Sequence, residues 1–215
     1  MQKLLNGALT FRRHMFSAYR GLFEELSKGQ SPEALFITCS DSRVVPTLIT
    51  AADPGDLFVL RNIGNIIPPY DPEDRDNAEA AALEYALSIL KVKHIVVCGH
   101  SRCGAMKAAL GPLDPRVKQV RSWLRHVDPA KRIHSGHPQV LTQQPDSAEA
   151  MEQERVDLLS QLNVLVQIKH IKTYPSALER LNSGALELHA WFFEIDHASL
   201  YTYNNELDEF ISIEQ

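Results

Sequence analysis

Two short segments of the chain carry three side chains that are good ligands for a soft divalent metal. Cys39 opens the segment CSDSR, and His100 and Cys103 lie within the segment GHSRCG. Two thiolates and one neutral imidazole suit zinc, and three protein ligands leave the fourth tetrahedral position for water. Structural zinc sites normally have four protein ligands, and the sequence contains no CxxC pair. The sequence therefore predicts one zinc ion per subunit in a centre of the open, catalytic type.

The spacing of His100 and Cys103 is weak evidence by itself, because a buried cysteine is commonly an inert packing residue. We expect that role for Cys98, which ends an apolar run and which strand alternation directs away from the neighbouring site residues. The chain has three cysteines, an odd number, so a disulfide framework is not expected. Free thiols are typical of a cytoplasmic protein, and a thiolate centre requires them.

Short apolar runs at residues 34–38, 57–60 and 94–98 are typical of buried parallel strands. A helical pattern lies between the second run and the third. This order predicts right-handed crossovers and a parallel sheet, whose ligands bind beyond the carboxyl ends of the strands. Cys39 and His100 each follow one of these runs. We therefore expect the two side chains to meet at one edge of the sheet. The presence of both CSDSR and GHSRCG in one chain is stronger evidence for a metal site than either segment would be alone.

Outside this centre, the pattern predicts an amphipathic helical arm within residues 1–30 and an exposed polar loop over 129–147. Further helices are expected over 148–168 and 177–181, and closing strands over 186–195 and 200–203. The expected fold class is α/β: a central, mostly parallel β-sheet flanked by helices, with an N-terminal helical arm and C-terminal edge strands. No linker divides residues 1–215, so we expect a single domain.

The composition argues against two kinds of partner. The net charge is −5, whereas proteins that bind nucleic acid usually have a clustered basic face. We interpret the basic stretch 116–132 as a solvated helical face and loop. No apolar run approaches the ~20 residues that cross a bilayer, and the N-terminus lacks the apolar core of a signal peptide. We expect a cytoplasmic protein with no nucleic-acid or membrane partner.

The same segments resemble the signature segments of the beta-class carbonic anhydrases. CSDSR and GHSRCG match the two signatures, and the resemblance extends through residues 55–65, 84–86 and 188–191. It covers nearly the whole chain and is strongest to the plant and cyanobacterial branch. It implies a carbonic anhydrase (carbonate dehydratase, a zinc lyase). Such an enzyme reversibly hydrates carbon dioxide to bicarbonate and a proton, by attack of zinc-bound hydroxide on carbon dioxide.

The resemblance also implies roles beside the metal ligands. Asp41 would accept a hydrogen bond from the zinc-bound hydroxide, and Arg43 would keep Asp41 ionised and away from the metal. A weak Asp–Arg surface pair is the alternative. The family's other branch has a tryptophan near position 36, linked to an inhibitory bicarbonate site. This chain has Phe36, so we expect a centre that Asp41 does not close. Arg61 is expected to support the site or a subunit contact.

Five further residues match positions that the family uses to bind substrate: Gln30, Phe58, Ile63, Tyr85 and Gly104. The glutamine would donate an amide hydrogen bond to an oxygen of carbon dioxide or bicarbonate. The three large apolar and aromatic residues would form a pocket for a linear, nonpolar substrate, and the glycine backbone would border it. Without the resemblance, core packing is the better interpretation of the apolar residues, and the glutamine is an ordinary loop residue.

The resemblance implies a homodimer or a larger homo-oligomer, in which Gln30, Phe58 and Tyr85 act in a neighbour's site. Two other functions remain open. Some relatives hydrolyse carbonyl sulfide or carbon disulfide with the same fold and zinc, and the pocket residues do not separate these gases. A zinc-stabilised scaffold or carboxysome shell component is the non-enzymatic alternative, although the sequence does not support a carboxysome shell or scaffold partner. Asp41 and Arg43 beside an incomplete ligand set favour catalysis.

The nine histidines of the chain do not identify a proton shuttle. We interpret His126, His134 and His137 as solvated side chains in or near the polar loop. His94 and His189 lie in expected strands, where a structural histidine is favoured over a catalytic one.

Overall fold

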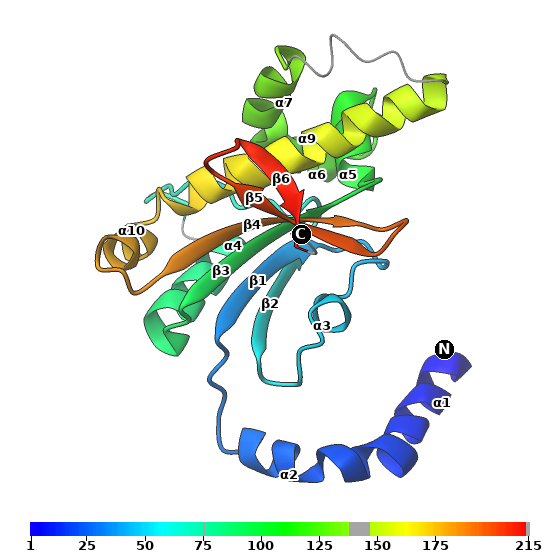
Figure 1. The fold of residues 1–215 in the computed structure, drawn as a ribbon, viewed down its shortest axis with the longest axis vertical. Coiled ribbons are helices and arrows are strands. Elements are labelled where there is room, and N and C mark those ends of the chain that lie inside the picture. Colours follow the sequence, from blue (N-terminus) through cyan, green and yellow to red (C-terminus); the bar gives the residue numbers. More distant parts are fainter. Residues whose placement is uncertain (75, 138–146, 214–215) are drawn as a thin grey trace.

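A six-stranded sheet forms the centre of the fold in a computed structural model that describes residues 1–74, 76–137 and 147–213 (Figure 1). The strand order is β2-β1-β3-β4-β5-β6. The first four strands pair in parallel, and β5 and β6 are added by antiparallel pairing. The strands are β1 Ala34–Cys39, β2 Leu57–Asn62, β3 His94–His100, β4 Glu187–Glu194, β5 Ser199–Asn204 and β6 Glu209–Ser212. The expected α/β class and mostly parallel sheet are confirmed.

The register of the parallel strands brings the carboxyl ends of β1, β2 and β3 to one edge of the sheet. Cys39 lies opposite Asn62 on β2, and Thr38 lies opposite Cys98 on β3. Neighbouring strands are only about 4.8 Å apart, so side chains at these ends lie within reach of one another. The expected strands are confirmed, and each continues one or two residues past its apolar run. The two closing strands are also confirmed, whereas the short β6 was not predicted.

Helices precede, connect and follow the strands of the sheet. Those before β3 are α1 Gln2–Thr10, η1 Phe11–Met15, α2 Phe16–Leu26, α3 Pro46–Ile49, α4 Ala78–Glu84 and η2 Tyr85–Leu90. Those after β3 are α5 Gly104–Leu110, α6 Lys118–Leu124, η3 Arg125–Val127, α7 Asp128–Ser135, α9 Ala148–Ile171 and α10 Pro175–Asn182. Side-chain caps begin two of them: Asn77 accepts the Ala80 N–H at 3.0 Å, and Ser147 accepts the Ala150 N–H at 3.1 Å.

The long helix α9 packs across one face of β3 and β4 (Figure 1). Gly99 allows this close approach, because a Cβ there would lie 2.7 Å from Cγ2 of Val164 and 3.0 Å from Oγ of Ser160. The buried apolar side chains of this layer include Leu35, Ile37, Ile95, Val97, Val164 and Ile171. They form the main core of the domain, which fixes the sheet edge where the ligand-bearing strands end.

The opposite face of the sheet is covered less completely. Phe36, Val96 and Trp191 form a smaller cluster there, with Ile49 of α3 and Leu200 of β5 packed against it. The rings of Phe36 and Trp191 meet edge to face, with centroids 5.9 Å apart. This face carries the even-numbered residues of β1 and β3, so His94 at the amino end of β3 points to the same side.

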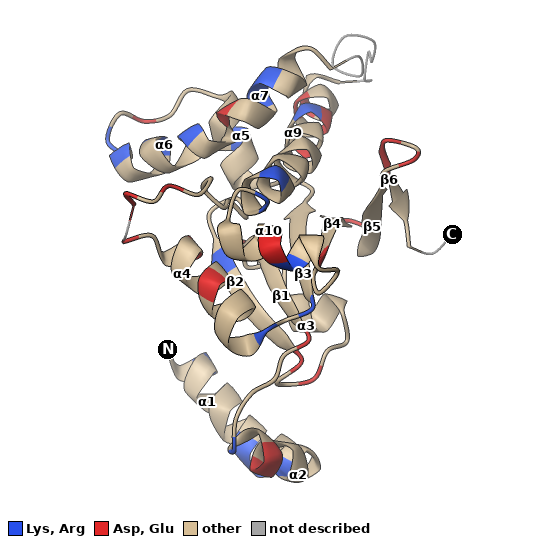
Figure 2. Ribbon diagram, turned by 90° about the vertical axis from the view of Figure 1, so that its left-hand side faces the viewer, with Lys and Arg blue, Asp and Glu red and all other residues tan. Residues whose placement is uncertain are grey.

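The first 26 residues form the expected N-terminal helical arm, which stands away from the rest of the molecule (Figure 1). Figure 2 shows the arm again at the end of the molecule opposite α6 and α7. None of the residues of α1 or α2 is buried. Leu4, Leu5 and Leu9 expose 70%, 53% and 50% of their surface. The arm therefore presents an apolar surface that its own chain leaves uncovered.

The prediction of a polar loop over 129–147 is wrong for residues 129–135. Residues Asp128–Ser135 form helix α7, which has a proline in its first turn and an acidic residue at its start, both favourable at a helix N-terminus. Residues 138–146 of the expected loop lie outside the described residues. Within the described ranges, no helix has both the length and the apolar character that crossing a membrane requires.

Candidate metal centre

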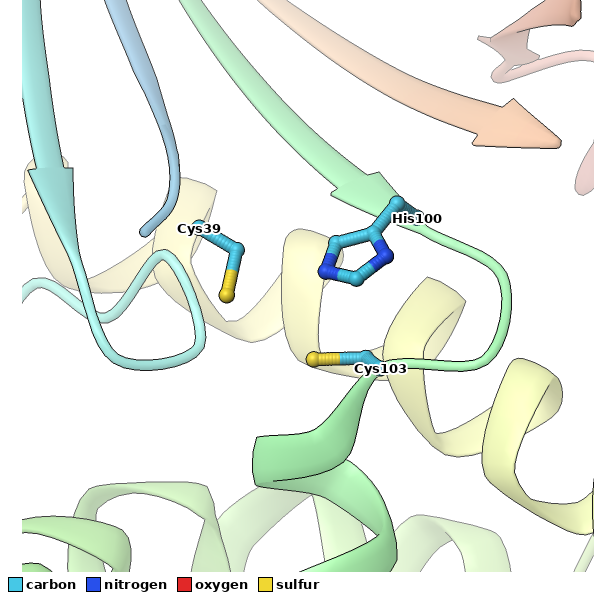
Figure 3. Close-up of side chains that lie close together, drawn as sticks. All are labelled: Cys39, His100 and Cys103. Atoms are coloured by element: carbon cyan, nitrogen blue, oxygen red, sulfur yellow. The ribbon is translucent and has the colours of Figure 1, made fainter. Parts of the chain in front are cut away.

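The side chains of Cys39, His100 and Cys103 converge at the carboxyl edge of the sheet (Figure 3). Cys39 is the last residue of β1, His100 is the last residue of β3, and Cys103 precedes the first residue of α5. Their potential ligand atoms all lie within 4.8 Å of one another. All three residues are buried, with at most 5% of their surface exposed. Strand ends far apart in the sequence thus supply one compact group of two sulfurs and one nitrogen.

The imidazole of His100 is held in the form that a metal requires. Its Nδ1 lies 2.8 Å from the carbonyl oxygen of Ser101. Because a carbonyl can only accept, the ring proton is on Nδ1 and the lone pair is on Nε2. That buried Nε2 has no hydrogen-bond partner among the described residues. An unpaired buried nitrogen is costly, and a cation between it and the two sulfurs would give it a partner. The ring therefore fits a metal ion.

The two thiols interact strongly with each other. The Cys103 thiol donates a hydrogen bond to Cys39, which lowers the pKa of Cys39 to about 4, and the N–H of Gly64 adds a contact at 3.4 Å. The same interaction, together with burial, raises the pKa of Cys103 well above its ordinary value. Without a cation, one sulfur is therefore a thiolate and the other remains a thiol. A divalent cation favours two thiolates by binding both.

Asp41 is bound by Arg43 instead of joining the three ligands. The guanidinium donates from Nε to Oδ1 at 2.9 Å and from Nη2 to Oδ2 at 2.7 Å, and the Arg43 N–H donates to Oδ1 at 3.0 Å. These hydrogen bonds hold the pKa of Asp41 well below its usual range. Asp41 lies outside the metal-competent group of Cys39, His100 and Cys103. The arrangement therefore keeps an ionised carboxylate beside the three potential ligands without adding it to them.

Arg61 and Asn62 fix the backbone around the first ligand. Arg61 donates from Nε to the carbonyl oxygen of Cys39 at 3.1 Å and from Nη2 to that of Asp41 at 2.7 Å. The Asn62 amide pairs with both backbone groups of Ile66, accepting at 2.8 Å and donating at 2.7 Å. The loop between them carries Gly64, whose N–H points at the Cys39 sulfur. Side chains from β2 thus hold both the ligand and the loop beside it.

The substrate-binding residues inferred from the resemblance fall into two groups. Ile63 adjoins Gly64 in the sequence, and Gly104 adjoins Cys103. Ile63 exposes 45% of its surface, and no heavy atom lies within 4 Å of a Cβ placed on Gly104. Phe58 and Tyr85 lie elsewhere, stacked on each other with ring centroids 5.8 Å apart. The phenylalanine is four residues before the end of β2, which is roughly 13 Å along a strand.

Gln30 lies in the exposed link between the arm and β1. Among the described contacts, none joins Gln30 to the Cys39 group. The structure of one chain therefore brings together the three predicted metal ligands, Asp41 and Arg43, but it does not bring Gln30 or the Phe58–Tyr85 pair to them.

Several groups that shape the site are not apparent from the sequence. The carbonyl oxygen of Ser101 selects the tautomer of His100. The carboxylate of Asp157 accepts the N–H of Arg102 at 2.6 Å, where the backbone is left-handed with φ of 55°. This contact stabilises the sharp turn between the second and third ligands. Asp157 reaches the site only through this contact with a backbone N–H that is 55 residues away in the sequence. No local sequence pattern could therefore have identified its role.

Two of the histidine interpretations change. His134 is buried, with 2% of its surface exposed, and its Nε2 lies 3.0 Å from the carbonyl oxygen of Arg155. It is thus a packed residue and not a solvated one, because α7 packs on α9. His126 is partly buried, and its ring packs edge to face on that of Trp123, with centroids 5.7 Å apart. That indole donates to the carbonyl oxygen of Ile63 at 2.8 Å.

Comparisons with known proteins agree with this geometry. The family model described as carbonic anhydrase matches residues 34–200. A carbonic anhydrase of Synechocystis sp. is 43% identical over 99% of this chain and 74% of its own length. One from Pseudomonas aeruginosa is 39% identical over 99% of this chain and 92% of its own length. The similarity to cyanobacterial members is thereby confirmed.

Solved structures give the same result at the level of the fold. The beta-carbonic anhydrase CcaA superimposes with a TM-score of 0.89 at 41% identity, covering 99% of this chain and 98% of the other. A tetrameric beta-carbonic anhydrase from Sordaria macrospora gives a TM-score of 0.81 at 33% identity, covering 94% of this chain and 95% of the other. Together with the converging ligands at the sheet edge, these matches show that the chain belongs to the carbonic anhydrase family, in its beta class.

Proposed function

We propose that this chain catalyses the reversible hydration of carbon dioxide to bicarbonate and a proton, with one zinc ion per subunit. The observation that carries the proposal is the buried, unpaired Nε2 of His100 beside two cysteine sulfurs. Asp41 is ionised close by and is held away from that group by Arg43. Membership in the family supports the reaction, and the donor set of two sulfurs and one nitrogen supports zinc.

The residues that would hold zinc are Cys39 and Cys103 through Sγ and His100 through Nε2. When bound, zinc supplies Lewis acidity that lowers the pKa of water towards ~7. The Asp41 carboxylate accepts a hydrogen bond from the attacking hydroxyl group and directs its oxygen lone pair at the carbon of carbon dioxide. Since Arg43 already donates to both oxygens of Asp41, the carboxylate remains an acceptor and does not take up the proton.

The substrate pocket that we propose contains Gln30, Phe58, Ile63, Tyr85 and Gly104. A linear, nonpolar substrate favours apolar walls, and an amide donor from Gln30 would fix one of its oxygens. The assignment rests on family membership, because within one chain only Ile63 and Gly104 adjoin the metal ligands. The exposed Tyr85, at 44% of its surface, is consistent with a contribution across a subunit interface.

We propose that the protein is a homo-oligomer built from dimers. The apolar arm that its own chain leaves uncovered supports this, since Leu4 and Leu5 expose 70% and 53% of their surfaces. Solved relatives described as tetrameric add support. In such an assembly Gln30 and the Phe58–Tyr85 pair would complete a neighbour's pocket. We further propose that residues 1–215 act as a single domain in the cytoplasm, where the three free cysteines stay reduced.

The proposal is tested by measuring carbon dioxide hydration by stopped flow together with the zinc content of each preparation. Wild type is expected to hydrate carbon dioxide with one catalytic zinc per chain, and Cys103→Ala is expected to lose both properties. Cys98→Ala is the matched control, because Cys98 is also a buried cysteine but lies outside the ligand group. An active wild type without metal would contradict the proposal, as would faster turnover of carbonyl sulfide or carbon disulfide than of carbon dioxide.

A further inference from the structure

A second group of potential metal ligands lies at the amino ends of β3 and β4. Its members are His94, Glu187 and His189. The register pairs His94 with Glu187 across the two strands, and His189 lies two residues further along β4, on the same face of the sheet. Nδ1 of His94 is 3.1 Å from Nε2 of His189, and Oε2 of Glu187 is 3.7 Å and 3.8 Å from these two nitrogens.

We propose that His94, Glu187 and His189 form a second site for a divalent transition-metal cation of the zinc type, separate from the Cys39 centre. Two imidazole nitrogens and one carboxylate oxygen are an established ligand set for such ions. Ligand atoms about 2.0–2.2 Å from a tetrahedral zinc ion are about 3.4 Å from one another. The three separations on this face already scatter around that value, so a cation needs only small side-chain movements.

The surroundings of the group also favour a cation. A hollow on this face of the sheet is lined by His94 and His189 together with Glu33 and Asp56, and no lysine or arginine is among its lining residues. The two histidine side chains are 32% exposed and that of Glu187 is 69% exposed. An ion can therefore reach the group from solvent, and water can occupy its remaining coordination positions.

The environment of His189 also suits a cation. Burial, with the nearby His94, lowers the pKa of His189 below its ordinary value, against the opposing effect of Glu187. Nδ1 of His94 and Nε2 of His189 face each other at 3.1 Å, and a cation between them would be a partner for both nitrogens.

The proposed second site is far from the catalytic centre. His94 and His100 are the two ends of β3, which places them roughly 20 Å apart along an extended strand. A cation here would tie together the amino ends of two adjacent parallel strands. Because it binds the folded sheet and not the unfolded chain, it would raise the stability of the protein by mass action.

The test is equilibrium dialysis of the full-length zinc-loaded protein against a series of Zn²⁺ concentrations, with metal counted per chain by mass spectrometry. Wild type is expected to bind a second equivalent, and Glu187→Gln and His189→Ala are expected to weaken that step at least tenfold. The control is His197→Ala. His197 is a surface histidine whose Nδ1 lies 3.1 Å from Oε2 of Glu194, and among the described residues it belongs to no three-ligand group. It should bind two equivalents.

Activity and stability separate this site from the catalytic one. Glu187→Gln and His189→Ala are expected to keep the first zinc and the wild-type rate of carbon dioxide hydration. Excess Zn²⁺ should raise the melting temperature of wild type and of Cys103→Ala, but not of Glu187→Gln. Saturation of wild type at one equivalent would overturn the proposal, and so would a second equivalent that binds Glu187→Gln as tightly as wild type. That exposed substitution decides the outcome even if His189→Ala fails to fold.

Discussion

The guanidinium of Arg43 joins the carboxylate of Asp41 to the backbone of Arg102. It donates to both carboxylate oxygens, at 2.9 and 2.7 Å, and to the Arg102 carbonyl oxygen at 3.1 Å. Arg102 lies between His100 and Cys103 in the sequence. One side chain therefore couples the segment after β1 to the loop that carries the other two ligands, and it fixes the carboxylate relative to the metal centre.

The first prediction concerns this coupling. We expect Arg43→Ala to lower kcat/KM about 10–100-fold, the loss typical when a residue that orients an active-site group is removed. Zinc should be retained, because the three ligands are untouched. Stopped-flow hydration and zinc content measured on the same preparation check both parts of this prediction.

A matched control for Arg43 exists in the same chain. Asp114 and Arg116 form another Asp-x-Arg pair, in which the guanidinium contacts both carboxylate oxygens. This pair is far more exposed, with 89% of the Arg116 side chain in solvent. Arg116→Ala should leave the rate unchanged. Equal losses in the two variants would contradict a specific role of Arg43.

The second prediction concerns Gly64, whose N–H contacts the Cys39 sulfur. Its φ is +80°, and a Cβ there would lie 2.9 Å from Cε of Met106 and 3.2 Å from Cβ of Ala105. We expect Gly64→Ala to lower the free energy of unfolding by more than the about 1–2 kcal/mol of left-handed backbone strain alone. It should also weaken zinc binding by shifting the loop.

Gly184 supplies the control for this substitution. Its φ is +72°, but nothing lies within 4 Å of a Cβ placed there. Gly184→Ala should therefore show the backbone strain without the steric contact and without any change in zinc content. Urea unfolding of both variants separates the two effects, and equal losses of stability would show that the contact at Gly64 is relieved easily.

The third prediction concerns the arm. Leu5 and Leu9 expose 53% and 50% of their surface in one chain, so a monomer should tolerate polar replacements there. If the arm covers a second chain, the double variant Leu5→Asp/Leu9→Asp should shift the molecular mass in light scattering towards the monomer and reduce activity. Leu207→Asp, at an exposed position of 60% in the β5–β6 turn, should do neither.

The fourth prediction concerns alkaline stability. The hydroxyl of Tyr174 donates to the carbonyl oxygen of Pro68 at 2.9 Å, and burial raises its pKa to about 12. The ordinary value is ~10, so the folded state favours the protonated phenol. Its contribution to stability is complete below pH ~10 and is lost as the pH rises towards the folded value.

Tyr174→Phe should therefore lower the free energy of unfolding by about 1 kcal/mol at neutral pH, with a shrinking difference from wild type above pH ~10. Tyr70→Phe, which alters an exposed ring that contacts Tyr174, should keep the wild-type pH dependence. Denaturant unfolding from pH 7 upwards provides the comparison. A constant difference between wild type and Tyr174→Phe at all pH values would contradict the assigned titration.

The sequence was sufficient for the parts of the molecule where a local pattern has one physical solution. Short apolar runs such as 94–98 are typical of buried parallel strands, and the order of strands and helices then places Cys39 and His100 at one edge. The arm was also predictable from its helical spacing. By contrast, β6 is four residues long and has no pattern that exceeds the background of a C-terminal turn.

Contacts over long sequence distances could not be predicted in this way. The contact of Asp157 with Arg102 depends on how α9 packs across the sheet. The same packing converts His134 from an expected surface residue into a buried one. The pairing of His94, Glu187 and His189 depends on the exact register of β3 and β4, which no single segment specifies.

The main-chain ladder between β1 and β3 sets the distance from Cys39 to His100 independently of any ion. Small zinc domains derive their folding free energy from the metal and unfold when it is chelated. In this chain the large apolar core of the sheet and α9 supplies the folding free energy instead. The strand ladder therefore holds the predicted ligands in place before any ion binds. Chelation should therefore yield an empty but native protein that regains its ion without refolding.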